Sequence, residues 1–583
     1  MAAQSSALGP DARAGALAGL SATTAEEPLD VLIVGGGIVG VGSALDAVSR
    51  GLSVGLLEQR DLASGTSSRS SKLVHGGLRY LEMFDFGLVR EALEERGLLL
   101  TRLAPHLVRP VPFLYPLHRT IERPYVGAGL ALYDALAMVG KYEMGVPRHR
   151  HLFRKQIARI APDLRLDRLT GAVRYYDCQV DDARLVVTLA RTAAHHGSLI
   201  ATRTRVTGFL REGPRVVGVR ATDLESGSEL EVRARVVVNA TGVWTDDVER
   251  LLGGSLSMDV EASKGIHLVV PRDRIRSECG FITRTEKSVL FVIPWGRHWI
   301  IGTTDTAWNL DLAHPAASRT DIDYLLEHVN KLLRVPLDHD DVEGVYAGLR
   351  PLLAGKAGRG VGSGGEGEAR SATTKVSREH TVVSPVPGLV LIAGGKLTTY
   401  RVMARDAVDL AVRGWPDVAP SHTERVPLLG ADGFLTRTNQ RVALSRRTGL
   451  EVGRIDHLLG RFGGLIDEVL ALIAARPELA EPLPGTEDYL SAEVVYAVTH
   501  EGARHLDDVL ARRTRISIET FDRGTLAVTA AADLMAAELG WDQPRRDDEV
   551  DHYLRRVEAE RQSQEKLTDQ EADEARVSAP EIV

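Results

Sequence analysis

Three stretches of the chain share one pattern, in which a strand-like run of mostly apolar residues is followed by glycine and then by a segment with helical spacing. The first is "DVLIVGGG" (residues 30–37), which leads into "IVGVGSALDAVSRG" and a further apolar run, "LSVGLLE", that ends at Glu58. The others are "ARVVVNATG", which ends at Gly242, and "GLVLIAGG", which ends at Gly395. Short apolar runs bounded by glycine are typical of buried parallel strands. The pattern predicts one α/β sheet that is assembled from separated segments.

Two other regions have different patterns. "SVLFVIPWGRHWIIGTTD" (residues 288–305) is rich in strand-forming residues and suits an antiparallel sheet inserted between the parts of the first one. From about residue 421, stretches such as "EVVYAVTHEGARHLDDVLARRT" have helical spacing. We therefore expect a first domain at approximately 29–110, 170–245 and 380–420, an inserted domain at approximately 111–169 and 246–379, and an all-α domain at 421–560.

Both ends of the chain and one internal stretch lack these patterns. Residues 1–28 are rich in Ala, Ser, Gly and Thr and have no basic and apolar parts of a secretory signal, so we expect a disordered extension. Residues 561–583 are charged, and we expect a disordered tail. The Gly- and Ser-rich stretch at 355–375 is expected to be a flexible surface loop.

Composition narrows the class of protein. The net charge of −8 and the pI of about 6.2 argue against nucleic-acid binding, because no domain-wide basic excess is present. The two cysteines, Cys178 and Cys279, are too few and too far apart for a disulfide framework or a Cys-rich metal site. We therefore expect a reducing compartment and no bound metal.

The longest apolar stretch is shorter than the roughly 20 residues that cross a bilayer. It is "YVGAGLALYDALAMVG" (Tyr125–Gly140), and it contains Asp134. A buried or amphipathic helix accounts for this stretch, and a helix that lies in a membrane interface is the alternative.

The glycines after the first apolar run match a dinucleotide-binding motif. Gly35, Gly37 and Gly40 form G-x-G-x-x-G between a predicted strand and a predicted helix, where glycine permits close approach to a pyrophosphate. Glu58 ends the next predicted strand, where an acid accepts hydrogen bonds from an adenosine ribose. Because "NATG" and "LIAGGK" add two later glycine turns along an extended cofactor, we predict FAD, with NAD as the alternative.

The segment "TSSRSSKLVHGGLRYLE" (residues 66–82) gathers hydroxyls and cations and has no acidic residue before Glu82. It is either a solvated basic loop or a segment that faces an anion. Because it follows Glu58, we expect it to run along the cofactor, with its hydroxyls toward phosphate and flavin oxygens.

These motifs resemble those of the FAD-dependent, membrane-associated (aerobic) glycerol-3-phosphate dehydrogenases, within the D-amino-acid-oxidase-like flavoproteins. The matching stretches span roughly residues 29–405 and are "GGGIVG", "TSSRSSKLVHGGLRYLE", "YYDCQVDDARLV", "NATGVW", "SKGIHLVVP", "FVIPWGRHWIIGTTD", "YAGLRPL", "SREH" and "GGKLTTYR". The helical region after residue 421 is also similar to the C-terminal domain of that family. The resemblance implies an α/β fold with a Rossmann-type FAD-binding domain, an inserted antiparallel-sheet α+β substrate domain and an all-α C-terminal domain.

The resemblance also implies an activity. Such an enzyme oxidises sn-glycerol 3-phosphate to dihydroxyacetone phosphate by hydride transfer from C2 to N5 of FAD, and passes the electrons to a menaquinone or ubiquinone. It implies a homodimer that is cytoplasmic and peripherally associated with the inner face of the membrane. An oxidase of the same fold, which reduces dioxygen to peroxide, is the first alternative. A flavin-binding or RNA-modifying module without substrate redox is a distant one.

In the resemblance, three arginines fall in the substrate pocket, namely Arg79, Arg350 and Arg378. A guanidinium donates two parallel hydrogen bonds and suits a phosphate group, whereas a surface ion pair is the alternative for each. His267 is the leading candidate for the group that accepts the proton of the substrate hydroxyl, and His75 is its competitor.

Lys396 is expected to stabilise negative charge on the flavin, because it stands at the start of a predicted helix. With His267 and Arg350 it forms the predicted catalytic set, while Tyr80 and Thr398 are further expected substrate contacts. Asp305 in "GTTD" is expected to order the pocket or its cations. Asp181 and Asp182 are expected to cap a helix rather than to act as acids or bases.

The predicted cofactor contacts come from the glycine turns, from the residues at Glu58 and from the basic segment, which is residues 66–82. They are Gly35, Gly37, Ile38, Gly40, Glu58, Gln59, Thr66, Ser67, Ser68, Ser71, Lys72, Leu73, His75, Gly76, Gly77, Ala240, Thr241, Gly242, Gly394, Gly395, Lys396, Leu397 and Thr398.

Overall fold

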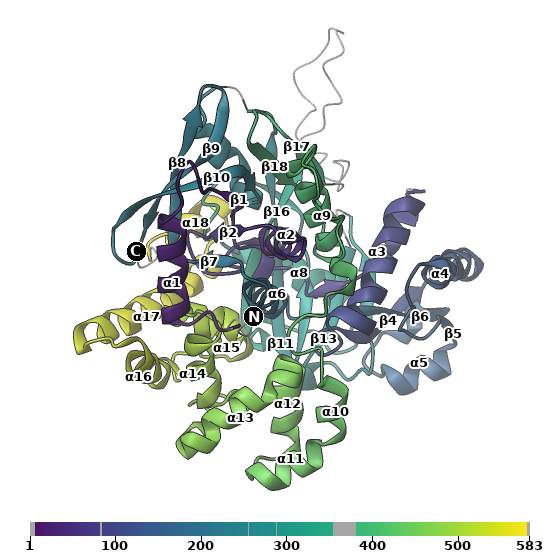
Figure 1. Ribbon diagram of the computed structural model, residues 1–583. Helices are drawn as coiled ribbons and strands as arrows, with labels where there is room; N and C mark the ends of the chain where they lie inside the picture. The colour runs from purple at the N-terminus through teal and green to yellow at the C-terminus, as the bar shows by residue number, and fades with distance from the viewer. Residues whose placement is uncertain (1–5, 82–83, 255, 287–288, 354–379, 580–583) are drawn as a thin grey trace.

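The computed structural model describes residues 6–81, 84–254, 256–286, 289–353 and 380–579, and the strands within these ranges form two sheets (Figure 1). The first sheet has the order β17 (Thr381–Val383), β18 (Leu389–Ala393), β10 (Glu229–Asn239), β1 (Leu29–Val34), β2 (Val54–Leu57) and β7 (Leu199–Ala201). All pairs along it are parallel except that of β17 with β18. A hairpin of β8 (Thr204–Glu212) and β9 (Arg215–Asp223) extends from β10.

The predicted parallel sheet is confirmed, because the three apolar runs that end in glycine are neighbouring strands. Val34 at the end of β1 pairs with Asn239 of β10, and Asn239 pairs with Leu391 of β18. The carboxyl ends of these strands therefore lie at one edge of the sheet.

Three helices, α2 (Ile38–Ser49), α6 (Asp182–His195) and α9 (Tyr400–Ala411), share one apolar core with this sheet. Gly42 of α2 faces Tyr400 of α9, and a Cβ on this glycine would lie 2.9 Å from the tyrosine ring. The glycine thus lets α2 and α9 approach closely, which brings the turn after β18 toward the turn after β1. The short helix α7 (Thr245–Arg250) follows β10.

The second sheet is mostly antiparallel, as expected for the inserted domain. Its order is β15 (Thr306–Trp308), β11 (Val260–Pro271), β14 (His298–Gly302), β13 (Val289–Trp295), β12 (Gly280–Arg284), β4 (Arg109–Leu117), β6 (Gly171–Gln179) and β3 (Leu73–Val74). In addition, β16 (Gly344–Leu353) pairs with β11, and β5 (Arg150–Leu152) pairs with β6. The helices of this part are α3 (Phe86–Leu98), α4 (Glu122–Val139), α5 (Arg154–Ile160) and α8 (Arg319–Asn330).

Two segments belong to the second sheet although the sequence pattern placed them in the first domain. β6 pairs with β4 from Arg109 opposite Gln179 to Leu117 opposite Gly171, and β3 pairs with the end of β6. The predicted boundary near residue 170 therefore comes too early. An apolar strand pattern does not identify the sheet to which a strand belongs.

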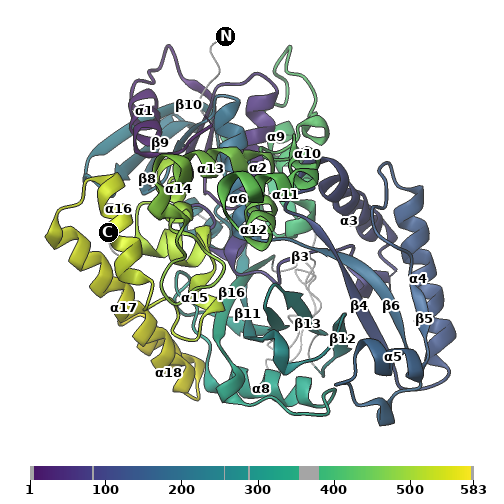
Figure 2. The ribbon, with the colours of Figure 1, turned by 90° about the horizontal axis from the view of Figure 1, so that it is seen from below.

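The C-terminal part is helical, as predicted. It comprises α10 (Phe434–Asn439), α11 (Arg441–Thr448), α12 (Val452–Phe462), α13 (Ile466–Ala475), α14 (Ser491–Thr499), α15 (Ile516–Glu519), α16 (Val528–Leu539), α17 (Gln543–Glu565) and α18 (Asp569–Arg576). Figure 2 shows these helices beside the sheets, with α17 and α18 along one flank.

The expected disorder of the tail is wrong for residues up to 579. In α18, Ala572 is fully buried, and Asp569 accepts a hydrogen bond of 2.6 Å from Lys264 of β11. The charged composition suggested disorder, but here the charges pair with groups on other elements. Residues 580–583 lie outside the described residues.

The expected disorder of the N-terminal extension is also wrong over α1 (Pro10–Ser21). This helix packs against β7 and β10, with Leu20 fully buried. Arg13 donates to the carbonyl of Thr202 at 2.8 Å and pairs with Asp223. Alanine-rich composition is equally compatible with a helix, and tertiary contacts decide the outcome.

The apolar stretch around Asp134 forms α4, which is amphipathic in its packing. Leu130 and Tyr133 are buried, whereas Tyr125 and Val139 are 66% and 77% exposed. None of the helices in the described ranges combines the length and apolar character that spanning a bilayer requires.

Candidate functional site

A cavity of about 360 Å³ lies at the carboxyl ends of β1, β10 and β18. Three glycine turns line it, which contain Gly35 and Gly37, then Ala240 to Gly242, and then Gly394 and Gly395. This is the edge at which open α/β sheets bind nucleotides. Segments that are hundreds of residues apart therefore form one wall.

The first turn leaves no space for side chains. A Cβ on Gly36 would lie 2.9 Å from Cβ and Cγ of Glu58, and Gly35 has a φ of +112°. The backbone consequently faces the cavity directly, as a pyrophosphate at the N-terminus of α2 requires. The hydroxyl of Ser67 reaches the same place, where it accepts a hydrogen bond of 3.0 Å from the backbone N–H of Ile38.

Glu58 lies on the wall of this cavity beside Gln59. Its carboxylate accepts hydrogen bonds from the backbone N–H of Gly36 at 2.6 Å and of Arg60 at 2.8 Å. Burial raises the pKa of Glu58, and the two backbone donors oppose that shift. The cavity fits an extended dinucleotide. Its glycine turn lets a pyrophosphate approach the backbone closely, and Glu58 is a fixed acceptor for a ribose at another part of the wall.

A second cavity of about 290 Å³ adjoins the first. Their common lining is Ile38, Thr66, Ser67, Pro351, Gly395, Lys396 and Leu397. The second cavity is also lined by His75, Tyr80, His267, Arg350 and Thr398, which come from four separate segments. A flavin reaching across the common wall and a small substrate would therefore meet in this space.

His267 lies in β11 with its imidazole between two groups. Its Nε2 is 2.8 Å from the hydroxyl oxygen of Ser71, and its ring stacks on Tyr346 with a centroid separation of 4.7 Å. Burial lowers the pKa of His267 well below its usual range, and the charges of Arg350 and Lys72 lower it further. The imidazole is consequently neutral near pH 7 and is able to accept a proton.

Arg350 lies in β16 and its guanidinium is oriented by the chain between β14 and β15. It donates to the hydroxyl of Thr303 at 3.0 Å and to the carbonyl of Thr304 at 3.3 Å, and Asp305 lies 3.6 Å away. Gly265 provides the space, since a Cβ there would lie 2.8 Å from the guanidinium carbon. Asp305, which also bonds to Ser263, holds the cation at the cavity.

Lys396 lies where the two cavities meet. Its ammonium nitrogen is 3.7 Å from the centroid of the Tyr80 ring. Two residues further on, the hydroxyl of Thr398 accepts a hydrogen bond of 3.1 Å from the backbone N–H of His75. The turn before α9 is therefore joined to the basic segment.

Some of the predicted contact residues line neither cavity, namely Gly40, Ser68, Lys72 and Gly76. The ammonium of Lys72 instead pairs with Asp182 at 2.7 Å, and both side chains are fully buried. Asp181 caps α6 by accepting from the backbone N–H of Arg184, as predicted, whereas Asp182 joins the ion pair. The side chain of Arg79 and the whole of Arg378 lie outside what the structure describes, as does the loop at 355–375.

The contacts that orient His267, namely the Ser71 hydroxyl and the Tyr346 ring, were not predicted from the sequence. Tyr346 and Arg350 are four residues apart on β16, and side chains at such spacing share one face of a strand. The alternation in "YAGLRPL" could therefore have identified Tyr346. The described residues contain no group of three His, Cys, Asp or Glu side chains arranged to hold a metal ion.

Comparisons with known proteins agree with this geometry. Residues 30–401 match the family model described as FAD dependent oxidoreductase, and residues 421–546 match the C-terminal domain of alpha-glycerophosphate oxidase. The glycerol-3-phosphate dehydrogenase of Mycobacterium leprae is 55% identical over 99% of this chain and 95% of its own length. The mitochondrial glycerol-3-phosphate dehydrogenase of Bos taurus is 34% identical over 90% of this chain and 72% of its own length.

Solved structures show the same architecture. The glycerol-3-phosphate dehydrogenase of Bacillus halodurans complexed with FAD has a TM-score of 0.75 and 28% identity, and the match covers 94% of this chain and 98% of that one. The L-alpha-glycerophosphate oxidase of Mycoplasma pneumoniae, with a TM-score of 0.51, 18% identity and coverage of 68% of this chain and 98% of that one, shares the fold.

The fold and the two adjoining cavities define a flavoprotein oxidoreductase whose cofactor is FAD. The glycine turns fit that cofactor, and the predicted fold class is confirmed. With 55% identity over nearly its whole length, the chain belongs to the family of FAD-dependent glycerol-3-phosphate dehydrogenases.

Proposed function

We propose that the protein oxidises sn-glycerol 3-phosphate to dihydroxyacetone phosphate and transfers the two electrons to a quinone. The observation that carries this proposal is the second cavity, where a guanidinium and a neutral imidazole face the space beside the FAD site. A guanidinium suits a phosphate because it donates two parallel hydrogen bonds, and a neutral imidazole can accept the proton of a hydroxyl.

Each side chain has a proposed role in that reaction. Arg350 binds the substrate phosphate, and we extend this role to Arg79 and Arg378. The Nε2 atom of His267 accepts the proton of the C2 hydroxyl in the position now held by the Ser71 hydroxyl. His75, which lines the same cavity, is the alternative acceptor. FAD supplies the acceptor for the hydride of C2 and the route of both electrons to the quinone.

Lys396 and Thr398 act at the junction of the cavities in this proposal. The ammonium of Lys396 stabilises negative charge that develops on the cofactor, since it lies where both cavities share their wall. The hydroxyl of Thr398 holds the backbone of His75 in place. Tyr80 fixes the ammonium through its ring.

The experiment that tests the substrate is anaerobic addition of glycerol 3-phosphate to the yellow protein, with glycerol and lactate as controls. Bleaching of the flavin absorbance by glycerol 3-phosphate alone supports the proposal. Equal bleaching by glycerol removes the role of the phosphate, and an unchanged spectrum with all three compounds refutes the activity.

A third cavity supports the quinone as acceptor. It measures about 370 Å³, is lined largely by apolar side chains, and shares Leu78, Ile282 and Val289 with the substrate cavity. At its mouth Phe84 and Tyr125 are 77% and 66% exposed. An apolar cavity with exposed aromatic side chains that adjoins the substrate cavity suits a lipid-soluble acceptor and contact with a membrane.

We accordingly propose that the flank formed by α3 and α4 rests on the inner face of the cytoplasmic membrane. Figures 1 and 2 show this flank on the side away from α16 and α17. Phe84→Ser should reduce binding to phospholipid vesicles, whereas Leu435→Ser, at a 71% exposed leucine of α10, should not. Equal vesicle binding by both variants would exclude this flank.

We also propose that the protein is a homodimer, which the family resemblance supports. The molar mass of the protein in detergent solution would test this proposal.

The alternative acceptor is dioxygen, as in the oxidases that share this fold. Reduced protein mixed with a soluble ubiquinone or menaquinone analogue should reoxidise faster than with air-saturated buffer. Faster reoxidation in air with release of peroxide would replace the quinone by oxygen.

A further inference from the structure

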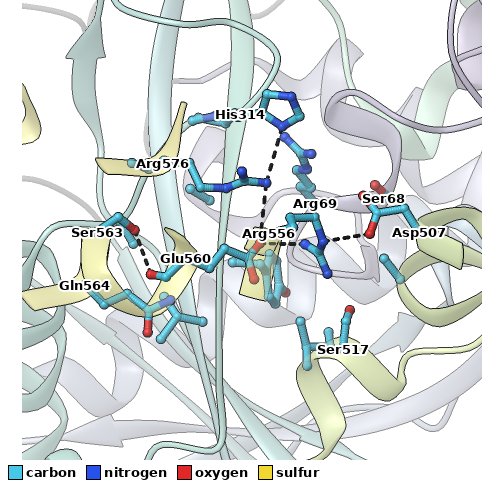
Figure 3. A pocket seen from close by; sticks show the side chains of 18 of the residues that line it. Ser68, Arg69, His314, Asp507, Ser517, Arg556, Glu560, Ser563, Gln564 and Arg576 are labelled. Carbon is cyan, nitrogen blue, oxygen red and sulfur yellow. Dashed lines mark hydrogen bonds and ion pairs between the residues drawn. The ribbon is translucent and has the colours of Figure 1, made fainter. Parts of the chain in front are cut away.

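Residues 66–72 lie between the substrate cavity and the C-terminal helices. Ser71 lines the substrate cavity. Ser68 and Arg69 also meet the C-terminal helices, and Figure 3 shows them at a small cavity that residues of α15 and α17 line. The segment ends at Lys72, whose side chain lines neither the substrate cavity nor the FAD cavity. The proposed function assigns no role to this lysine.

The carboxylate of Asp182 holds this segment in place. Its Oδ2 atom accepts hydrogen bonds from the backbone N–H of Ser70 at 2.9 Å and from the Ser70 hydroxyl at 2.7 Å. Its Oδ1 atom accepts from Nζ of Lys72 at 2.7 Å and from Arg515 at 2.5 Å. The Lys72 ammonium also donates to the carbonyl of Ser68 at 3.0 Å. One buried carboxylate thus joins α6, the segment and the residue before α15.

The backbone at Lys72 requires this support. Its φ of +55° lies in the left-handed region, which a residue other than glycine occupies only where its surroundings hold it there. The backbone N–H of Lys72 donates to the hydroxyl of Ser70 at 3.0 Å. The preceding residue, Ser71, has its hydroxyl oxygen 2.8 Å from Nε2 of His267. The contacts of Lys72 therefore fix the residue that faces the imidazole.

Tyr346 forms a second connection between the segment and the imidazole. Its hydroxyl donates to the carbonyl of Ser70 at 3.0 Å, and its ring stacks on His267. The Lys72 ammonium lies 5.1 Å from the centroid of the same ring and 5.7 Å from that of Trp295. A carboxylate, a carbonyl and two aromatic faces thus surround the cation.

These partners favour the charged form of Lys72. Burial and the charge of Arg515 lower the pKa of Lys72, whereas the charges of Asp182 and Asp181 raise it. The carboxylate at 2.7 Å and the two ring faces stabilise the ammonium and have no comparable attraction for a neutral amine.

Two charged groups of the described residues act on His267. Burial lowers the pKa of its imidazole, and the charges of Arg350 and Lys72 lower it further. β14 places Gly302 beside the imidazole, and Tyr346 of β16 keeps its proton because burial raises its pKa well above the usual range. The phosphate of a bound substrate would offset the charge of Arg350. Lys72 is then the cation that continues to act on the imidazole.

We propose that Lys72 and Tyr346 are positioning residues for His267, and that Asp182 and Arg515 hold Lys72 in place. This inference rests on the proposed function, in which His267 accepts the proton of the substrate hydroxyl. Lys72 keeps the segment against the imidazole, and its charge disfavours the imidazolium before substrate binds. Arg515 lines neither the FAD cavity nor the substrate cavity, and it links the helical domain to the reaction through Asp182.

Lys72→Met removes the charge and keeps a side chain of similar length. Asp182 retains Arg515 as its partner, so no carboxylate is left unpaired. The measurement is the pH dependence of the limiting rate of flavin reduction by glycerol 3-phosphate in the FAD-loaded protein. This rate requires the neutral imidazole, and loss of a nearby cation favours the imidazolium. The midpoint of the decline at low pH should therefore move upward by at least about half a pH unit.

Lys264→Met is the matched control. Lys264 is fully buried, pairs with Asp321 at 2.6 Å and faces the ring of Trp308. It lies three residues before His267 on β11, which places it on the opposite face of the strand, and its charge does not act on the imidazole. Lys264→Met should lower stability and leave the pH midpoint unchanged. Equal midpoints in Lys72→Met and Lys264→Met would overturn the proposal.

A second pair of variants decides the question if Lys72→Met fails to fold. Tyr346→Phe keeps the ring on His267 but loses the hydrogen bond to Ser70. The limiting rate should fall about 3- to 10-fold with an unchanged apparent Kd, because the segment is held less firmly. Tyr324→Phe removes a buried hydroxyl that has no hydrogen-bond partner among the described residues, and it should change neither quantity. Equal limiting rates in these two variants would overturn the proposal.

NMR titration of histidine-labelled, FAD-loaded protein separates this inference from the proposed function, with His267→Gln identifying the signal. The pKa of His267 should rise in Lys72→Met whether or not His267 accepts the substrate proton. Absence of flavin reduction in the unsubstituted protein would refute the proposed function. An unchanged titration of His267 in Lys72→Met, in a protein that glycerol 3-phosphate does reduce, would overturn this inference alone.

Discussion

At the scale of single residues, the proposed chemistry depends on two side chains whose charge states follow from their surroundings. Arg350 is held by Thr303, Thr304 and Asp305 at the wall of the cavity, so it is oriented before substrate binds. His267 is kept neutral by burial and by nearby cations. One group remains positive for the phosphate, and the other remains available for the proton.

Arg350→Gln should lower kcat/KM for glycerol 3-phosphate by about 2–5 kcal/mol of transition-state stabilisation, because the phosphate loses a charged partner in a partly buried site. Steady-state kinetics with an artificial acceptor measure this loss. Arg220→Gln, in an exposed ion pair of β9, is the control and should change nothing. A kcat/KM for Arg350→Gln near that of the control would exclude the phosphate contact.

His267→Gln should slow flavin reduction more than it weakens substrate binding, since glutamine can hydrogen-bond but cannot accept the proton. Single-turnover reduction at several substrate concentrations separates the limiting rate from the apparent Kd. If the apparent Kd rises while the limiting rate is unchanged, His267 binds substrate and His75 becomes the candidate acceptor.

The depressed pKa of His267 also predicts a pH profile. The limiting rate of reduction should stay flat as the pH falls through about 6.5, where an unperturbed histidine titrates, and should decline only below that value. Protonation favours the unfolded chain, so the stability from this group is present above about pH 6.5 and is lost as the pH falls toward the folded pKa. An inflection of the rate at or above pH 6.5 would contradict the buried environment.

At the scale of elements, the regular patterns predicted the structure where local sequence and burial agree. β1, β18 and the last residues of β10 are almost entirely apolar, because both faces of the parallel sheet are covered. A Cβ on Gly35 or Gly395 would collide with neighbouring atoms, and Gly242 has a φ of +64°. The three strands and the wall of the FAD cavity were therefore predictable. The site residues on those turns could be predicted from the local sequence, without information on contacts to distant parts of the chain.

Elements whose stability comes from distant partners were not predictable in the same way. α1 and α18 have compositions common in disordered chains, and they are ordered by Leu20 in the first sheet's core and by Asp569 against Lys264. The contact between Ser71 and His267 also joins residues far apart in sequence. The second sheet takes β6 because of its pairing with β4, which no local pattern encodes.

Leu20→Ala tests whether α1 is an integral element. The leucine is fully buried, so its truncation should lower the free energy of unfolding by about 2–5 kcal/mol. Thermal or urea unfolding of the FAD-loaded protein measures this, with the exposed Leu435→Ala as control. A difference between the two variants of under about 0.5 kcal/mol would mean that α1 contributes nothing to the fold.

At the scale of the whole molecule, buried ion pairs join the helical domain to the sheets. Asp61, after β2, holds both Arg512 and Arg513, and its side chain is 1% exposed. Arg184 of α6 pairs with Glu501, and Arg515 pairs with Asp182. The helical domain is thus connected to α6 and to the segment after β2 by ion pairs that are shielded from water.

Asp61→Asn should destabilise the protein by about 3–5 kcal/mol, because two buried guanidinium groups lose their carboxylate. Calorimetry should also show a broader or divided unfolding transition, since one of the buried links between the helical domain and the sheets is weakened. Asp247→Asn removes an exposed ion pair with Arg250 and should have little effect. An unchanged single transition and an unchanged Tm in Asp61→Asn would show that the pairs of Asp61 do not couple the domains.

We propose that Arg350 and His267 hold glycerol 3-phosphate in the second cavity while the hydride of its C2 atom is transferred to FAD. The most direct measurement is anaerobic stopped-flow reduction of the flavin at saturating substrate, with ordinary glycerol 3-phosphate and with substrate deuterated at C2. The account predicts that deuterium slows the reduction and that glycerol gives none at the same concentration. Equal rates for the two isotopic forms in a chemistry-limited reduction, or absence of reduction by either, would contradict the account.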